Sequence, residues 1–155
     1  MLIKVPHFKD MEIKYLVLDF NGTLAYNGRV TNSTKELLKE LMLRLEVFVV
    51  TADTYGTVKK ELSDIDVKYH IISKDNGTND KEKFVLNLGK ENTVAIGNGQ
   101  NDLRMLKSAE IGICIVGNEG CYIETLIASD IIINDIDNAL KLLLDEKKLI
   151  ATLRK

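Results

Sequence analysis

Short apolar runs alternate along this chain with amphipathic segments, and this alternation constrains the fold more than any other feature. The runs EVFVVT (46–51), TVAIGNG (93–99) and IGICIVG (111–117) are rich in β-branched residues, and helical patterns separate them. Short buried strands divided by helices are typical of βαβ units in a mostly parallel sheet. The sequence therefore predicts an α/β fold, a three-layer Rossmann-like domain with a mostly parallel central sheet. Without a repeat or a linker, the 155 residues are expected to form one domain, 1–155.

The individual elements follow from the same patterns. We expect strands at 1–6, 12–20, 46–51, 67–72, 93–99, 111–117 and 130–134, and helices at 31–45, 53–64, 79–90, 101–109, 121–128 and 135–149. Ser33 and Glu36 have the spacing of a capping box at the start of the first helix. Gly89 is expected to end the helix over 79–90.

Charge and hydropathy exclude several classes of protein. The net charge is −2, from 21 basic and 23 acidic residues, so no electrostatic argument supports a nucleic-acid partner or an anionic membrane. No apolar run approaches the roughly 20 residues that cross a bilayer, and the first ten residues lack the apolar region of a signal peptide. Two cysteines are too few for a disulfide framework. A cytoplasmic location is therefore expected.

Polar residues follow the predicted strands at the points where ligands bind to sheets of this kind. Asp19–Asn21 end the strand over 12–20, Thr51–Asp53 end the next, and Asn98–Asp102 end a third. Lys81 opens the helix after the strand over 67–72. Since ligands bind outside the carboxyl ends of the strands, these groups are expected to converge at one edge of the sheet.

The motifs at these strand ends resemble those of the haloacid dehalogenase-like superfamily of phosphatases and phosphotransferases. The matching pieces are Asp19-Phe-Asn-Gly-Thr-Leu24, Thr51, Lys81 and Gly97-Asn-Gly-Gln-Asn-Asp102, in the order and spacing of that superfamily. Thr51-Ala-Asp53, GNGQND and ASDIII (128–133) resemble the phosphorylation domain of P-type ATPases. The resemblance covers about residues 13 to 140 and implies a soluble, stand-alone relative of that domain, of the kind called a soluble P-type ATPase-like phosphatase.

The resemblance implies a set of roles for the matching residues. Asp19 would attack phosphorus and form an aspartyl phosphate. Thr51 and Lys81 would hold the phosphoryl oxygens, with backbone N–H groups around Gly22 and Ala52 adding donors. Lys83 competes with Lys81 for the role of phosphate-binding lysine.

A divalent cation is also implied. Mg²⁺ would be bound by the Asp19 carboxylate, the backbone carbonyl of Asn21, and the Asn98 and Asp102 side chains. These are oxygen donors, which Mg²⁺ prefers.

Two amides depart from the pattern of the superfamily. Asn21 stands where its phosphatases usually carry an aspartate that acts as general acid and base, worth about 10²–10⁴-fold in rate. An amide cannot move that proton, so a good leaving group, such as a nucleoside triphosphate or an acyl phosphate, and slow dephosphorylation are expected. Asn98 stands where a carboxylate usually binds Mg²⁺, and weaker cation binding is expected.

The spacing of the motifs leaves no room for a cap domain. There are 31 residues between Asp19 and Thr51 and 29 between Thr51 and Lys81, and predicted secondary structure fills both intervals. An open site suits a phosphorylated small molecule, a phosphoprotein, or a cap supplied by a neighbouring subunit of a homo-oligomer.

Two functions of different classes are compatible with these features. The first is a Mg²⁺-dependent phosphohydrolase or phosphotransferase acting through Asp19. The second is a weakly catalytic regulatory module that binds phosphate or a partner on the same fold. A Mg²⁺-free dehalogenase fits less well, because the acidic loop and the pair of Thr51 and Lys81 suit phosphate better. A dinucleotide-binding domain fits less well still, because GNGQND lacks the GxGxxG spacing.

Overall fold

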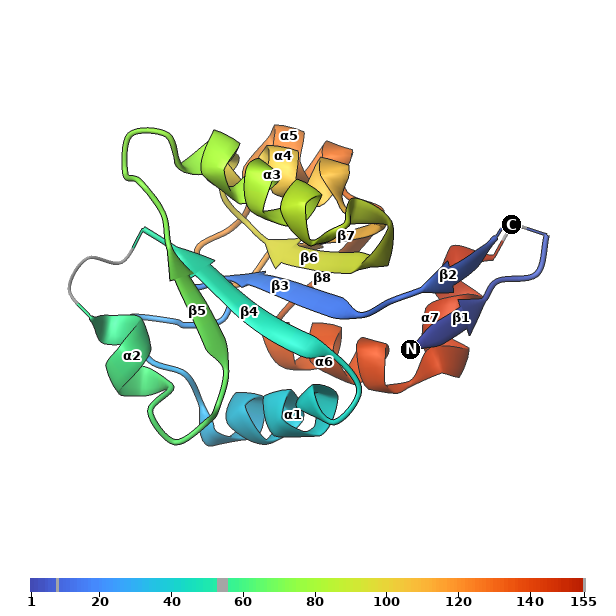
Figure 1. Cartoon of the computed structure of the whole chain (residues 1–155), viewed down its shortest axis with the longest axis horizontal. Coiled ribbons are helices and arrows are strands. Elements are labelled where there is room, and N and C mark those ends of the chain that lie inside the picture. The colour runs from blue at the N-terminus through green and yellow to red at the C-terminus, as the bar shows by residue number, and fades with distance from the viewer. Residues whose placement is uncertain (8, 53–55, 155) are drawn as a thin grey trace.

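Eight strands and seven α-helices alternate along the chain in a computed structural model that describes residues 1–7, 9–52 and 56–154 (Figure 1). The strands are β1 (Leu2–Lys4), β2 (Asp10–Glu12), β3 (Tyr15–Asp19), β4 (Glu46–Thr51), β5 (Lys68–Ile71), β6 (Thr93–Gly97), β7 (Ile111–Ile115) and β8 (Ile131–Ile133). The helices are α1 (Asn32–Met42), α2 (Thr57–Glu61), α3 (Gly77–Leu88), α4 (Leu103–Ser108), α5 (Ile123–Ala128), α6 (Ile136–Leu144) and α7 (Glu146–Leu153). Two 3₁₀ turns, η1 (Lys90–Asn92) and η2 (Gln100–Asp102), flank β6.

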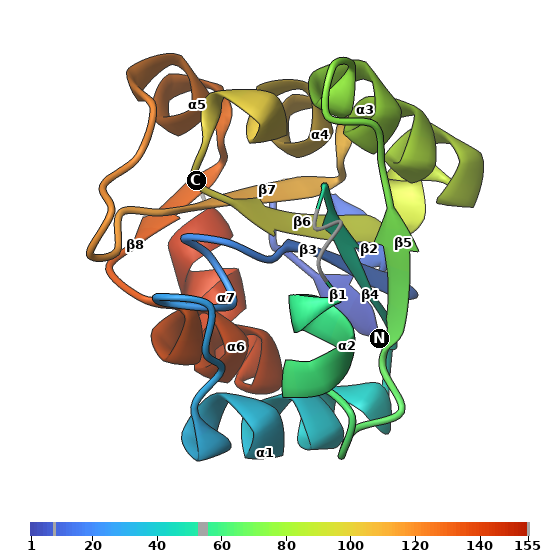
Figure 2. The same ribbon diagram turned by 90° about the vertical axis from the view of Figure 1, so that its left-hand side faces the viewer.

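Six strands form one parallel sheet in the order β5-β4-β3-β6-β7-β8. Helices α3, α4 and α5 cover one face, and α1, α2 and α6 cover the other (Figures 1 and 2). This confirms the predicted α/β fold with a central parallel sheet between two helical layers. The chain order reverses at β3, which pairs with β4 on one side and β6 on the other. Such a switch point is where open α/β sheets bind ligands.

The central strands are buried because helices lie on both faces of the sheet. All five residues of β6 and of β7 are buried, as are four of the five in β3. One apolar cluster packs α1 and α6 against one face, and a second packs α3 and α4 against the other. β5 at the edge of the sheet is exposed along its whole length. The buried middle strands hold the site rigidly at their carboxyl ends.

A two-stranded hairpin of β1 and β2 extends the molecule at the end of the sheet opposite the carboxyl end of β3 (Figure 1). The sequence predicts one strand over 12–20, whereas the structure has two, β2 and β3, separated at Ile13 and Lys14. The amide of Ile13 donates to the carbonyl of Met1, and that of Lys14 donates to Asn92. The chain therefore changes partner between the two strands, from the hairpin to the main sheet.

Three helix predictions differ from the structure. The closing helix expected over 135–149 is two helices, because Asp145 ends α6 and caps the amide of Lys148 in α7. The N-cap of α1 is Thr31, whose hydroxyl accepts from the Thr34 amide, so the capping box at Ser33 is wrong. Helix α2 is shorter than the expected 53–64, and residues 53–55 lie outside the described part of the chain. Gly89 ends α3 as expected.

Two further findings concern what the fold contains. Within the described parts of 20–50 and 52–80, the structure holds turns, helices and the sheet strands β4 and β5 but no inserted cap domain. Among the helices of the described residues, none combines the length and the apolar character that a bilayer crossing needs.

Candidate active site

Asp19 lies at the carboxyl end of β3, in the middle of the sheet. Its register partner on β4 is Val50, so Thr51 is one residue further along the neighbouring strand. On the other side, Leu18 of β3 pairs with Ile96 of β6, and β6 ends one residue later at Gly97. Three of the predicted motifs therefore meet at one edge because the parallel strands that carry them are adjacent.

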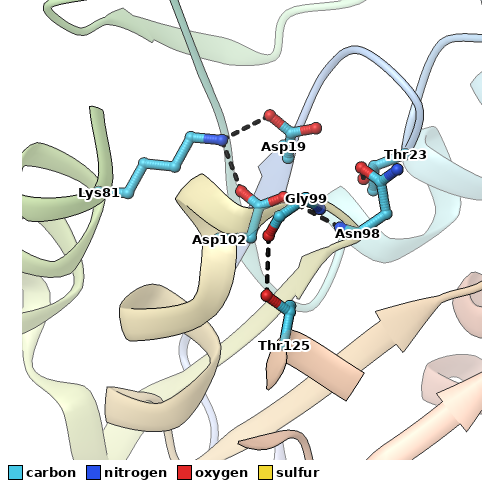
Figure 3. A network of polar contacts seen from close by, with 7 residues as sticks. All are labelled: Asp19, Thr23, Lys81, Asn98, Gly99, Asp102 and Thr125. Carbon is cyan, nitrogen blue, oxygen red and sulfur yellow. Dashed lines mark hydrogen bonds and ion pairs between the residues drawn. The ribbon is translucent and has the colours of Figure 1, made fainter. Parts of the chain in front are cut away.

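Lys81 reaches this edge from α3 and joins two carboxylates (Figure 3). Its Nζ donates to Asp19 Oδ1 at 2.5 Å and to Asp102 Oδ1 at 2.6 Å, and its side chain is fully buried. Lys83, by contrast, is exposed and lines a depression beside β5. The geometry places Lys81, not Lys83, beside Asp19.

Asp102 organises the loop that follows β6. Its Oδ2 accepts from the backbone amides of Asn98 and Gly99, both at 2.9 Å, while its Oδ1 accepts from Lys81. A Cβ at Gly97 would lie 2.5 Å from the Asp102 carboxyl carbon, so a side chain there would displace the carboxylate. Gly97, the first residue of GNGQND, is thus required for the close approach between β6 and Asp102.

The buried charges of the site do not balance. Two carboxylates face one ammonium, and burial followed by repulsion from Asp102 raises the pKa of Asp19 to about 7. Burial alone would lower the pKa of Lys81, but attraction to Asp19 and Asp102 and the hydrogen bonds to both raise it above its usual value. The ammonium is therefore firmly charged, and the set carries one excess negative charge only when Asp19 is ionised, above a pH of about 7.

Asn98 is held by residues that the sequence motifs did not identify. Its Oδ1 accepts from Thr23 Oγ1 at 3.2 Å and its Nδ2 donates to the Gly120 carbonyl at 3.1 Å. Thr125 donates to the carbonyl of Gly99 at 2.9 Å (Figure 3). Thr23 lies in the motif DFNGT, so the sequence could have indicated it. Gly120 and Thr125 lie in segments that carry no sequence signal for this site.

The turn after β3 carries Asn21 and Gly22. Asn21 is exposed and forms a bridge with Ala25, and the amide of Gly22 donates to the Ala25 carbonyl at 3.0 Å. Gly22 has a positive φ of 78°, which its lack of a side chain permits. A Cβ built on it would lie 2.8 Å from Asn98 Nδ2 and 2.6 Å from Glu119 Oε2. Gly22 therefore fits between the Asn98 amide and the Glu119 carboxylate only because it lacks a side chain.

The predicted phosphate-binding residues lie at the same edge. Thr51 is buried at the end of β4, and Ala52 follows it half-buried. Asp53 lies outside the described residues. Ala52 also lines a polar cavity of about 330 Å³, together with Asn76, Asn101 and others of the β5–α3 loop. This cavity therefore lies beside Ala52, the residue that follows Thr51.

The donors at this edge fit a divalent cation. The two carboxylates around Lys81 favour a cation, and the side chains of Asn98 and Glu119 lie against Gly22 in the turn after Asp19. Carboxylate and amide oxygens are the donors that Mg²⁺ prefers. Within the described residues, however, no three Asp, Glu, His or Cys side chains are gathered closely enough to hold an ion by themselves. Amide and backbone oxygens, or water, would have to complete the shell.

Comparison with known proteins agrees with this architecture. The family model described as haloacid dehalogenase-like hydrolase matches residues 72–119. An uncharacterised protein of Methanocaldococcus jannaschii is 49% identical over 78 residues, which are 48% of this chain and 84% of that protein. A second uncharacterised protein of the same organism is 41% identical over 39 residues, 25% of this chain and 89% of that protein.

Solved structures show the same fold at low identity. The 3-deoxy-D-manno-octulosonate 8-phosphate phosphatase of Moraxella catarrhalis is 20% identical, with a TM-score of 0.68 over 90% of this chain and 92% of that one. A cobalt-bound deoxy-D-mannose-octulosonate 8-phosphate phosphatase of Haemophilus influenzae is 16% identical, with a TM-score of 0.69 over 92% and 90%. The family match over residues 72–119 and this shared fold agree with the resemblance of the site motifs to the haloacid dehalogenase-like superfamily.

Proposed function

We propose that this protein is a Mg²⁺-dependent phosphohydrolase or phosphotransferase that forms an aspartyl phosphate on Asp19. The observation that carries the proposal is the Asp19 carboxylate, which ends the central strand and lies 2.5 Å from the buried ammonium of Lys81. Solved structures of the same fold include phosphatases of an octulosonate 8-phosphate and of phosphoserine, which supports this class of reaction.

Residues at the carboxyl ends of the sheet strands would carry out the steps of the reaction. An Asp19 oxygen bonds to phosphorus while the bond from phosphorus to the leaving oxygen breaks, and that oxygen keeps the electron pair. The charge of Lys81 stabilises the negative charge spread over the phosphoryl oxygens, and Thr51 supplies a hydroxyl donor beside it. Water then attacks phosphorus, releases phosphate and restores the Asp19 carboxylate.

The cation site would use Asp19, the Asn21 carbonyl, Asn98 and Asp102. Bound Mg²⁺ would neutralise negative charge on Asp19 and on the phosphoryl group. The uncompensated charge of two carboxylates around one lysine supports this set of ligands.

Asn21 narrows the choice of substrate. An amide cannot protonate the leaving oxygen or activate water, so the reaction favours leaving groups that are stable as anions, such as those of acyl phosphates or nucleoside triphosphates. For the same reason hydrolysis of the aspartyl phosphate is slow. The adjoining cavity, lined by amides such as Asn76 and Asn101, suits a small polar leaving group. A phosphoprotein, or a site completed by a second copy of the chain, is compatible with the same open edge.

A weakly catalytic regulatory module is the second candidate, and the two amides favour it. With Asn21 and Asn98 in place of carboxylates, the site would bind phosphate or a partner and turn over slowly. The two candidates differ in whether Asp19 becomes phosphorylated.

Covalent labelling separates these candidates. The protein is incubated with labelled acetyl phosphate or γ-labelled ATP and Mg²⁺, and label that is stable to acid and released by hydroxylamine is measured. If the protein is an enzyme that acts through Asp19, such label is expected on the wild type and none on Asp19→Asn. Absence of label on the wild type, or persistence on Asp19→Asn, would sink the covalent mechanism.

Asn21→Asp tests the account of the missing acid and base. An aspartate side chain at this exposed position can protonate the leaving oxygen as the carboxylic acid and then activate water as the carboxylate. Release of phosphate from an aryl phosphate ester is therefore expected to rise by about 10²–10⁴-fold. The measurement is kcat for ester hydrolysis beside the steady-state level of phosphorylated Asp19, which is expected to fall. An unchanged kcat would mean that proton transfer does not limit turnover.

A further inference from the structure

The loop between β7 and α5 is tied to the predicted cation site at several points. The carbonyl of Gly120 accepts from Asn98 Nδ2 at 3.1 Å, and the amide of Tyr122 donates to the Asn98 carbonyl at 2.9 Å. A Cβ on Gly117 would lie 3.6 Å from the Gly22 carbonyl oxygen. The loop therefore runs over the turn that follows Asp19 and is held there by backbone contacts.

Glu119 stands in the middle of this loop and turns its carboxylate toward the site. Its Oε2 lies 2.6 Å from the position of a Cβ on Gly22, and the same position is 3.1 Å from Asn98 Oδ1. The same position is 2.8 Å from Asn98 Nδ2. The Glu119 carboxylate and the Asn98 amide therefore both lie against Gly22, in the turn that follows Asp19.

The carboxylate of Glu119 has no cation of the protein to face. Among the described residues, no lysine, arginine or histidine forms an ion pair with it. No basic side chain of the described residues therefore neutralises this carboxylate.

We propose that Glu119 is an acidic member of the divalent-cation site and supplies the negative charge that Asn98 lacks. The inference rests on the proposed function, since the cation it serves is the one expected beside Asp19. The side-chain oxygen of Asn98 is neutral and already accepts a hydrogen bond from Thr23. Glu119, which lies against the same glycine as Asn98, adds a carboxylate to this part of the site. Mg²⁺ keeps several of its waters in protein sites, so the carboxylate can act directly or through one of them.

The conformation of the loop agrees with this role. Gly117 and Gly120 flank the segment that carries Glu119, with φ values of 52° and 75°. Glu119 itself is exposed, so its side chain can turn toward an ion without breaking a packed contact. The carboxylate needed at the site therefore comes from a different loop than the one that carries Asn98.

Binding of Mn²⁺ to the metal-free protein tests the proposal without any turnover. Free Mn²⁺ is measured by electron paramagnetic resonance at constant ionic strength for the wild type, Glu119→Gln, Glu124→Gln and Asn98→Asp. Glu124 is an exposed glutamate in the first turn of α5, and it serves as the matched control for a general loss of one negative charge.

Glu119→Gln is expected to weaken Mn²⁺ binding by about 10-fold or more, the usual effect of losing a supporting residue of a metal site. Glu124→Gln is expected to bind as the wild type does. Asn98→Asp is expected to bind more tightly, and Glu119→Gln added to Asn98→Asp is expected to cost less than it does alone. Equal losses in Glu119→Gln and Glu124→Gln, or no loss in either, would overturn the proposal, as would a wild type that binds no Mn²⁺.

Asp19 labelling at saturating Mg²⁺ separates this result from the proposed function. Labelled wild type with unchanged Mn²⁺ affinity in Glu119→Gln rejects the role of Glu119 and leaves the enzyme. Unlabelled wild type with a selective loss in Glu119→Gln rejects the phosphotransferase and leaves the cation site.

Discussion

At the scale of single residues, the state of the site depends on one ammonium shared by two carboxylates. Lys81 is fully buried, and its neighbours Asp19 and Asp102 are nearly so. Burying unpaired charge costs several kcal/mol, so each member of the set depends on the others. The same arrangement that would bind a phosphoryl group and a cation therefore also controls the stability of the metal-free protein.

Replacing Lys81 and Lys83 by methionine separates the two lysines. Lys81→Met leaves two buried carboxylates without a cation, so the free energy of unfolding at pH 8 without divalent ions is expected to fall by about 3–5 kcal/mol. Lys83 is exposed, and Lys83→Met is expected to change the free energy of unfolding by less than about 0.5 kcal/mol. Urea unfolding measures both. A stable Lys81→Met protein that still becomes phosphorylated on Asp19 would contradict the assigned role.

Asp19→Asn is expected to stabilise the metal-free protein more at pH 8 than at pH 5. The pKa of Asp19 rises from 3.8 in the unfolded chain to about 7 in the fold, because of burial and of Asp102. The folded state therefore holds the proton more tightly, and the wild type loses stability as pH rises from about 4 to about 7. Asparagine carries no proton to lose, so this loss disappears in the variant. Thermal unfolding in EDTA at both values measures the effect, and an equal gain at both would show that Lys81 already compensates Asp19 fully.

At the scale of elements, direct contact between β7 and α4 fixes the loop that carries Asp102. A Cβ on Gly112 of β7 would lie 2.5 Å from the backbone carbonyl oxygen of Leu106 in α4. Backbone atoms cannot turn aside as a flexible side chain does, so the helix would have to shift. The close approach of this strand and helix keeps the η2 turn and Asp102 against the end of β6.

Gly112→Ala tests this contact. The clash is expected to lower the free energy of unfolding by about 1–3 kcal/mol, the usual cost of overpacking. Gly77→Ala is the control, because its Cβ would meet only the Ile72 side chain, at 3.4 Å. Urea unfolding of both variants gives the comparison. Equal stability of the two would mean that α4 is not held as closely against β7 as described.

At the scale of the whole molecule, one apolar cluster joins the hairpin to the sheet and to the last helix. Ile3 of β1, Leu16 of β3 and Leu149 of α7 belong to the same buried cluster, and each is fully buried. The hairpin lies at the end of the sheet opposite the site (Figure 1). We expect the chain from 1 to 155 to unfold as a single cooperative unit for this reason.

Ile3→Ala tests that expectation. The cavity is expected to cost about 2–5 kcal/mol and to shift one unfolding transition as a whole, by circular dichroism and by tyrosine fluorescence alike. The fraction of folded protein that is labelled on Asp19 is expected to stay unchanged. A second, separate transition for the hairpin would show that β1 and β2 fold independently of the sheet.

Much of the fold and part of the site follow from the chain's own pattern. Buried β-branched strands and amphipathic helices specify the parallel sheet, and strand ends such as Asp19 and Thr51 are recognisable because ligands bind there. The sequence pattern does not reveal that the strand ends after Glu12 or that the last helix ends before Asp145, because the apolar periodicity continues across both positions. Ser33 has the sequence spacing of a cap, but in the structure its hydroxyl donates to Asp137 of α6. That bond depends on the packing of α1 against α6.

By itself, the sequence determined the fold class, the order of the motifs and the two amides, Asn21 and Asn98, that set the chemistry of the proposed site. These are properties of residue type and of spacing along the chain. Only the tertiary structure decided that Lys81 bridges two carboxylates and that Glu119 lies beside Gly22. Glu119 is 100 residues from Asp19, and no local pattern marks it. Such a contact arises because β7 follows β6 in the sheet, which turns the loop after β7 toward the end of β3.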